Sequence, residues 1–335
     1  MLPLVTILIP TFNRSVLLRQ ALESALAQSY SNLEIIVCDN ASSDDTGEII
    51  SQYATDHRLR YVRNTQNIGL VRNWQNGIEQ EAKGDWFLIL SDDDYLTDPN
   101  FISDAINRTK LNDDIRIVFA AGMVRYEKYQ TEVPMHIPYQ SIEDGKNIFI
   151  NRDLLIKPIE FILCGLLFHR ETALKHKPFS DLNNFCCDAG LYFKLCLNWK
   201  VAVLHNPVCV YREHGNNTLK NHKSWDQQIA ILRMYFALWI AANESGHFAR
   251  KQLQDWRKRV LVRACRTFVV GVKLYVSNGY STKVVLAEIR QLGGVGLVEL
   301  FASPIFILKL ILANSPPIYS NLLSIRIWNS LRKIN

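Results

Sequence analysis

The sequence predicts an α/β fold with a mainly parallel mixed sheet, and three observations support this prediction. Short apolar strands alternate with segments of helical periodicity in the first third of the chain. A short polar turn follows each of these strands. The strand at 86–90 is apolar throughout, which is typical of a strand buried on both faces of a parallel sheet. Together these features indicate consecutive βαβ units.

The N-terminal half contains the most regular pattern. Pro10 is expected to close the first strand because proline cannot donate a ladder hydrogen bond. Parallel strands bring their carboxyl ends to one edge of the sheet, so the four following turns should meet where α/β folds bind ligands. The predicted elements are strands at 4–9, 33–38, 59–62 and 86–90, helices at 16–28 and 46–53, and one helix that carries Arg72, Trp74, Ile78 and Ala82.

The middle of the chain is less regular. A Pro-containing connection is expected at 132–144, and Asp188 opens an amphipathic helix. Further strands are predicted at 115–120, 123–129, 201–204 and 208–211, with another within 159–169.

Charge divides the chain into two predicted domains. Residues 1–218 hold 21 Lys and Arg against 27 Asp and Glu, a net charge of −6, whereas residues 219–335 hold 17 against 5, a net charge of +12. We expect a catalytic domain at 1–218 and a basic, helical C-terminal region at 219–335. Such a region fits contact with an anionic membrane surface or nucleic acid, and equally a solvated helical face, a cap on the first domain or a dimer contact.

Several classes of site are excluded or disfavoured. The seven cysteines are odd in number and show no CxxC spacing, which argues against a zinc site or a disulfide framework. No GxGxxG follows the first strand and no P-loop motif is present. The N-terminus lacks the basic region and cleavage site of a signal peptide, so we expect a cytoplasmic protein.

Three consecutive carboxylates, Asp92, Asp93 and Asp94, follow the apolar strand at 86–90. Adjacent carboxylates repel one another unless a cation lies among them, and hard oxygen ligands suit Mg²⁺ or Mn²⁺. The alternative is a solvated acidic turn that caps the helix after Asp98 and Pro99. In the other turns, Asp39 could accept a hydrogen bond from a nucleobase imide, while Arg14 and Arg72 could face phosphates.

The ordered set of motifs resembles the family 2 glycosyltransferases. It comprises Pro10-Thr11-x-Asn13-Arg14, Asp39-Asn40-x-Ser42-x-Asp44-x-Thr46, Asn67-x-Gly69 and Ser91-Asp92-Asp93-Asp94. The resemblance covers roughly residues 3–215. It implies a GT-A fold, an inverting reaction and a nucleotide-diphospho-sugar donor, with a uridine base favoured. The nucleotide pocket that it implies consists of Pro10, Thr11, Asn13, Arg14, Asp39, Ser42, Asn67, Gly69, Arg72, Asp92 and Asp93.

The resemblance also implies roles in catalysis and metal binding. Asp188 would be the catalytic base, although an ordinary N-terminal helix acid is the alternative. Asp94, Asp92 and His214 would hold Mg²⁺ or Mn²⁺, and Arg212 would contact the diphosphate; a structural histidine is the alternative for His214. Many members carry Asp where this chain has Ser91, which leaves the exact carboxylate pair open.

The predicted function is transfer of a sugar to a hydroxyl of a glycan or lipid-linked acceptor, in polysaccharide or lipid-linked glycan assembly. The protein would then be cytoplasmic, with peripheral contact to the inner face of the plasma membrane as one option and no nucleic acid as partner. Two rivals stay open. A sugar-nucleotide pyrophosphorylase would normally open on a Gly-rich loop, which the turn after the first strand lacks. A non-catalytic nucleotide-sugar binding protein could dispense with Asp188.

Overall fold

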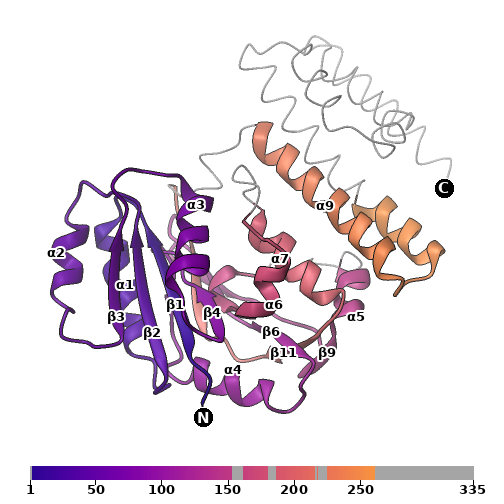
Figure 1. Ribbon diagram of the computed structural model, residues 1–335, viewed down its shortest axis with the longest axis horizontal. Helices are drawn as coiled ribbons and strands as arrows, with labels where there is room; N and C mark the ends of the chain where they lie inside the picture. Colours follow the sequence, from indigo (N-terminus) through magenta and orange to yellow (C-terminus); the bar gives the residue numbers. More distant parts are fainter. Residues whose placement is uncertain (1, 153–160, 180–185, 216, 218–224, 261–335) are drawn as a thin grey trace, which may run out of the picture. The chain divides into compact units, whose positions relative to one another are not determined.

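The structure, a computed structural model, describes residues 2–152, 161–179, 186–215, 217 and 225–260 (Figure 1). The chain divides into two compact units, one of Met1–Asn217 with Ala241–Ala249 and one of Thr218–Ile240 with Arg250–Asn335. The predicted domain division after residue 218 stays a prediction.

The first unit is built on an eight-stranded mixed sheet of order β3-β2-β1-β4-β10-β6-β11-β9 (Figure 1). The first four strands in this order are parallel to one another, whereas β10 and β9 run antiparallel to their neighbours. The bounds are β1 Val5–Thr11, β2 Leu33–Asp39, β3 Leu59–Arg63, β4 Trp86–Ile89, β6 Ile115–Ala120, β9 Ile142–Asp144, β10 Leu166–His169 and β11 Lys200–Leu204.

A second, four-stranded sheet has the order β5-β12-β7-β8. Its strands are β5 Tyr95–Leu96, β7 Met123–Tyr126, β8 Thr131–Pro134 and β12 Cys209–Glu213. Because β5 comes directly after the three aspartates and β12 directly before His214, this sheet brings a late segment of the chain to the acidic turn. The helices are α1 Ser15–Leu26, α2 Thr46–Ser51, α3 Leu70–Gln75, α4 Phe101–Thr109, α5 Gly145–Asn151, α6 Arg170–Lys175, α7 Cys187–Cys196 and α9 Trp225–Ser245, with a 3₁₀ turn η3 at Leu163–Gly165.

Apolar periodicity explains the packing of the parallel half. All seven residues of β1 are buried, as a strand covered on both faces requires. On α1 the buried side chains of Leu18, Ala21, Leu22 and Ala25 recur at helical spacing and join the core cluster of β1 and β2. Helix α9 and the helical segment 250–260 bury Leu238 and Trp256 completely. No helix among the described residues is long and apolar enough to span a membrane.

Pro10 does not end the first strand, contrary to expectation. It pairs with Cys38, and β1 continues to Thr11. Leu8 accepts a bond from Leu90 on the β4 side, and Thr11 accepts one from Asn40 on the β2 side. Because consecutive residues alternate between the two neighbours, Pro10 faces the β4 side, where the ladder has already ended at the Leu8–Ile89 pair. Its missing N–H therefore costs no ladder bond.

Three other expectations needed correction. The connection predicted at 132–144 contains the end of β8 and all of β9. The strand predicted at 123–129 stops at Tyr126, where the chain turns back into β8. The helix expected to carry Arg72 and Ala82 is α3 followed by a π-helical turn, η1, at Asn76–Glu81. Helical periodicity does not distinguish these two kinds of helix over so short a span.

Candidate active site

The turns after β1, β2, β3 and β4 lie at one edge of the sheet, as predicted, because these four strands are parallel. The first two turns are hydrogen-bonded to each other. The Asn13 N–H donates to Ser42 Oγ at 2.9 Å, and the Ser43 N–H donates to Asn13 Oδ1 at 2.7 Å. Asn13 has a φ of 53°, a left-handed conformation that asparagine tolerates better than most residues. These hydrogen bonds join the turns after β1 and β2 into one connected stretch of the sheet edge.

Asp39, the predicted contact for the nucleobase, is buried at the end of β2. Its Oδ1 accepts the Ser42 N–H at 2.8 Å, and its Oδ2 accepts the Tyr61 hydroxyl at 2.6 Å. The Arg63 guanidinium lies 3.5 Å from the same Oδ2. The sequence reasoning missed Tyr61 and Arg63. One sequence feature could have identified them. Tyr61 and Arg63 are two residues apart on a strand that pairs with β2, so both side chains lie on the same face of the sheet.

A chain of amide side chains fixes the turn after β3. Asn67 Oδ1 accepts from Asn40 Nδ2 at 2.8 Å and from the Gly69 N–H at 2.9 Å. Asn40 Oδ1 in turn accepts the Ile68 N–H at 2.9 Å. Gly69 has a φ of 87°, a value that residues with a Cβ rarely adopt, so glycine is needed where the chain turns into α3. Asn40 is also buried here; the sequence analysis placed it in the second motif but assigned it no role.

The three aspartates have different partners although they are adjacent in sequence. Asp92 accepts the Thr11 hydroxyl at 2.8 Å and pairs with Arg14 at 3.0 Å. Asp93 pairs with Arg14 at 2.8 Å and lies 3.1 Å from His214 Nε2. Asp94 Oδ1 accepts the backbone N–H of Arg212 at 2.9 Å. The structure thus joins the turns after β1, β4 and β12.

Burial dominates the electrostatics of this acidic turn. Asp92, Asp93 and Asp94 are only 4%, 6% and 2% exposed. Burial raises the pKa of Asp92 to about 6, although Arg14 and Thr11 oppose the rise. Burial, followed by the charge of Asp93, raises the pKa of Asp94 well above its usual range. Asp94 therefore has the carboxylate whose negative charge is least compensated by the protein.

The acidic turn fits a divalent cation that arrives with a diphosphate better than one held by protein ligands alone. Within the described ranges, no three His, Cys, Asp or Glu side chains form a metal-binding group. Mg²⁺ usually takes only one or two protein carboxylates and completes its shell with water and substrate phosphates. Asp94, buried and under-compensated, matches that requirement. Asp92 belongs to the same acidic turn, and His214 contacts that turn through Asp93.

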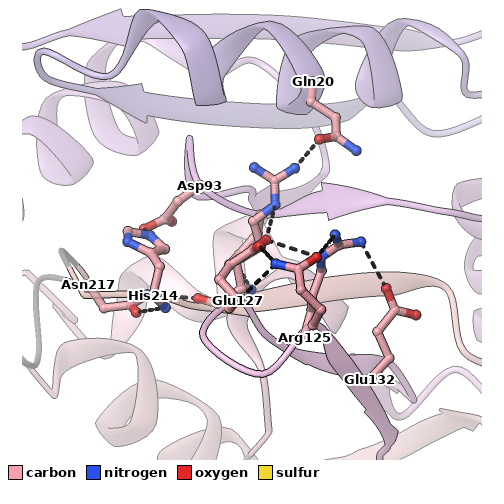
Figure 2. Close-up of polar contacts among 10 residues, drawn as sticks. Gln20, Asp93, Arg125, Glu127, Glu132, His214 and Asn217 are labelled. Carbon is pink, nitrogen blue, oxygen red and sulfur yellow. Dashed lines mark hydrogen bonds and ion pairs between the residues drawn. The ribbon is translucent and has the colours of Figure 1, made fainter.

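Hydrogen bonds, ion pairs and a cation–π contact hold the end of β12 and the residues that follow it (Figure 2). Figure 2 shows His214 directed at Asp93 and Asn217 beside the His214 backbone. The Arg212 side chain is 8% exposed, and its guanidinium contacts Gln20, the Tyr95 ring and Glu127. Protein groups thus contact Nη2 and Nε of this guanidinium, and the role of Arg212 as a diphosphate ligand stays a prediction.

The remaining predicted residues lie apart from this network. Asp188 is partly exposed in the first turn of α7, which packs against β6, and no described contact joins it to the acidic turn. Burial raises the pKa of Asp188, while hydrogen bonds from its own N–H and that of Ala189 lower it.

Arg72 is exposed in the first turn of α3, and none of the ion pairs among the described residues involves it. Its guanidinium is accordingly available to an anion.

Residues 6–174 match the family model described as glycosyl transferase family 2, and this segment covers half of the chain. The chain belongs to glycosyl transferase family 2. Membership of this family argues against the alternative that the protein is a sugar-nucleotide pyrophosphorylase. Asp188, Arg212 and His214 lie beyond the matched segment. The roles of all predicted site residues, inside the segment and beyond it, remain predictions.

Relatives and solved structures agree with the assignment of this family 2 glycosyltransferase. The chain is 42% identical over 98 residues to the GalNAc(5)-diNAcBac-PP-undecaprenol beta-1,3-glucosyltransferase of Campylobacter jejuni, a match that spans 28% of this chain and only 31% of that protein. TarS 1–349 of S. aureus, solved with UDP, aligns over 82% of this chain and 72% of its own with a TM-score of 0.56 and 14% identity. The mannosyltransferase PcManGT of Pyrobaculum calidifontis, solved with GDP-Man and Mn²⁺, aligns over 93% and 86% with a TM-score of 0.53 and 16% identity. These likenesses confirm the predicted fold class, a GT-A glycosyltransferase fold.

Proposed function

We propose that this protein is an inverting, metal-dependent glycosyltransferase that moves a sugar from a UDP-linked donor to a hydroxyl of a lipid-linked glycan. The observation that carries the proposal is the junction of the turns after β1, β4 and β12, where Thr11, Arg14 and Arg212 arrange three buried aspartates. The named substrates of the C. jejuni relative support a lipid-linked acceptor, and UDP in the TarS structure supports the base.

The donor would lie along the edge formed by the first four strands. Asp39, held by Ser42 and Tyr61, would receive the base. Asn13, in the turn after β1, and Asn67, in the turn after β3, would shape the ribose and diphosphate region. Arg72 would meet the diphosphate. Asp94, with Asp92 and His214 nearby, would hold Mg²⁺ or Mn²⁺, which supplies positive charge against the charge that develops on the leaving diphosphate.

Asp188 would act as general base in the transfer. Its carboxylate takes the proton of the acceptor hydroxyl while the oxygen forms a bond to the anomeric carbon. The bond from that carbon to the phosphate oxygen breaks, and the nucleoside diphosphate leaves with the electron pair. Attack from the face opposite the leaving group inverts the anomeric configuration. A raised pKa suits this role because it makes the carboxylate a stronger base.

The test is a donor screen followed by a transfer assay. UDP-sugars, beginning with UDP-glucose, should raise the melting temperature of the protein in the presence of Mn²⁺, because a ligand that binds only the folded state stabilises it. GDP-mannose serves as the comparison. With a lipid-diphosphate-linked GlcNAc or GalNAc acceptor, the product should have the anomeric configuration opposite to that of the donor. Retained configuration, or stabilisation by GDP-mannose alone, would contradict the proposal.

A further inference from the structure

The backbone of Arg212 connects two of the groups proposed to meet the metal and diphosphate. Its N–H donates to Asp94 Oδ1 at 2.9 Å, and its carbonyl accepts from Asn217 Nδ2 at 2.8 Å. Asn217 Oδ1 accepts the His214 N–H at 2.6 Å, and His214 Nε2 lies 3.1 Å from Asp93 Oδ2. The backbone of this one residue, through the peptide groups on its two sides, is therefore linked to both Asp94 and His214.

The side chain of Arg212 has three protein partners that hold this residue in place. The guanidinium stacks on the Tyr95 ring with its carbon 4.8 Å from the ring centroid, it donates to Gln20 Oε1, and its Nε lies 3.8 Å from Glu127 Oε1. Tyr95 belongs to β5, Gln20 to α1 and Glu127 to the turn after β7. Figure 2 shows Gln20 and Glu127. A planar guanidinium can satisfy all three at once, which a lysine ammonium cannot.

Glu127 supplies the negative charge of this arrangement. The same Oε1 atom lies 3.1 Å from Arg125 Nε, so one carboxylate oxygen is shared by two guanidinium groups. The Glu127 N–H also donates to the Glu213 carbonyl at 3.0 Å, next to Arg212. Glu132 pairs with Arg125 at 3.2 Å on the exposed edge strand β8 and has no described contact with Arg212. Figure 2 shows Glu127 and Glu132 on opposite sides of Arg125.

We propose that Glu127 and Arg212 are positioning residues that together form a clamp, which sets the placement of Asp94 and His214 for the metal-bound diphosphate. The proposal rests on the proposed function and replaces the direct role first predicted for Arg212. Loss of the Glu127 charge leaves the buried guanidinium with one fewer partner, and the end of β12 shifts with it. Displacements of about 1 Å at a reacting centre cost on the order of a hundredfold in rate.

The clamp predicts a specific effect on the linkage between metal and nucleotide. UDP affinity is measured by calorimetry once with EDTA and once with Mn²⁺. The affinity with Mn²⁺ divided by the affinity with EDTA is the coupling factor, which is typically about 5–150-fold for linked sites. In Glu127→Gln this factor should fall at least about fivefold, because Asp94 is misplaced. UDP affinity in EDTA should stay within about twofold of wild type, since the base and phosphate contacts of the other turns are intact.

The control variant is Glu132→Gln. It makes the same charge change at a residue that pairs with Arg125 but has no described contact with Arg212, so it should keep the wild-type coupling factor. Gln20→Met, which removes the partner on the other side of the guanidinium, should lower the factor in the same direction as Glu127→Gln. It also serves if Glu127→Gln fails to fold.

Five outcomes of these measurements decide between the clamp and its alternatives. A lowered coupling factor in Glu127→Gln, with normal UDP binding in EDTA and a normal Glu132→Gln, supports the clamp. An unchanged factor, or an equal loss in both glutamate variants, overturns it while the proposed function stands. Weaker UDP binding in EDTA would indicate that Arg212 contacts the diphosphate directly, which also overturns the clamp. Absence of any Mn²⁺ coupling in the wild type overturns the proposed function, and the clamp with it.

Discussion

Asp92, Asp93 and Asp94 show how three identical neighbours acquire different roles. Among the described residues, Arg14 and Thr11 contact Asp92, Arg14 and His214 contact Asp93, and the backbone N–H of Arg212 donates to Asp94. Partners 78 to 121 residues away create this difference. The family resemblance placed Asp94 first among the metal ligands, with Asp92 as its partner, but the sequence could not supply the physical reason, because that depends on partners from other turns.

Asp94→Asn is expected to abolish Mn²⁺-dependent transfer. Asparagine has nearly the same shape and can still accept the Arg212 N–H, so the fold should be preserved while the negative charge is lost. The measurement is initial rate against Mn²⁺ concentration, with circular dichroism to check folding. Asp104→Asn, the same change on the exposed face of α4, is the control and should leave the rate unchanged. Full Mn²⁺-dependent activity in Asp94→Asn would refute the assignment.

Asp188→Asn is expected to keep UDP-sugar binding and to lose transfer by a factor on the order of 10²–10⁴. In the wild type the base must be ionised, so the rate should fall as pH drops through the pKa of Asp188. Burial raises that pKa, which places the acidic limb of the profile above the ordinary aspartate value of about 3.9. The pH–rate profile at saturating donor measures this limb. Transfer at the wild-type rate by the variant would show that another group is the base.

At the scale of elements, α7 depends on a close approach to α5. A Cβ on Gly145, the first residue of α5, would lie 2.3 Å from the Trp199 carbonyl oxygen and 2.5 Å from that of Cys196, at the end of α7. Both obstructing atoms belong to the backbone, so they cannot move aside by a change of rotamer. The packing of the helix that carries Asp188 thus requires glycine at this position.

Gly145→Ala should therefore destabilise the protein by about 1–3 kcal/mol, the usual cost of overpacking. Urea denaturation monitored by circular dichroism measures the change. The matched control is Gly47→Ala in α2, where the nearest atom to the new Cβ is the Tyr61 hydroxyl at 3.8 Å. That variant should gain about 0.5–1 kcal/mol, since alanine loses less backbone entropy than glycine in a helix. Equal effects at the two positions would contradict this account of the α5–α7 contact.

At the scale of the whole molecule, the opposite charges of the two sequence regions predict behaviour at a membrane. The net charge of +12 over residues 219–335 should draw the full chain to vesicles that contain phosphatidylglycerol. Sedimentation with such vesicles should weaken as salt rises, because the screening length falls to about 3 Å at 1 M. Phosphatidylcholine vesicles are the control. Equal binding to both lipids, or preferential binding to RNA, would argue against a membrane role.

Sequence patterns predicted the parallel half of the fold well, because burial on both faces and helical spacing are local signals. The edge at which Thr11, Asp39, Asn67 and Asp92 gather followed from strand direction alone. The second sheet was not predicted, since β5 has two residues and β8 is exposed throughout. Without that sheet, the partners of Arg212 could not be foreseen. The predicted helices beyond residue 260 lie outside the described residues.

The contact between Gln20 and Arg212 joins residues 192 positions apart. Contacts of such separation form late, because the chain must first close a long loop. The parallel strands β1 to β4 can therefore assemble during synthesis well before the acidic turn receives its last partners. A nascent or truncated chain that ends near residue 174 would carry the nucleotide edge but not the clamp. Catalytic competence should then appear only when β12 has been made and has docked, so that synthesis of the segment up to Glu213 is the step that switches the enzyme on.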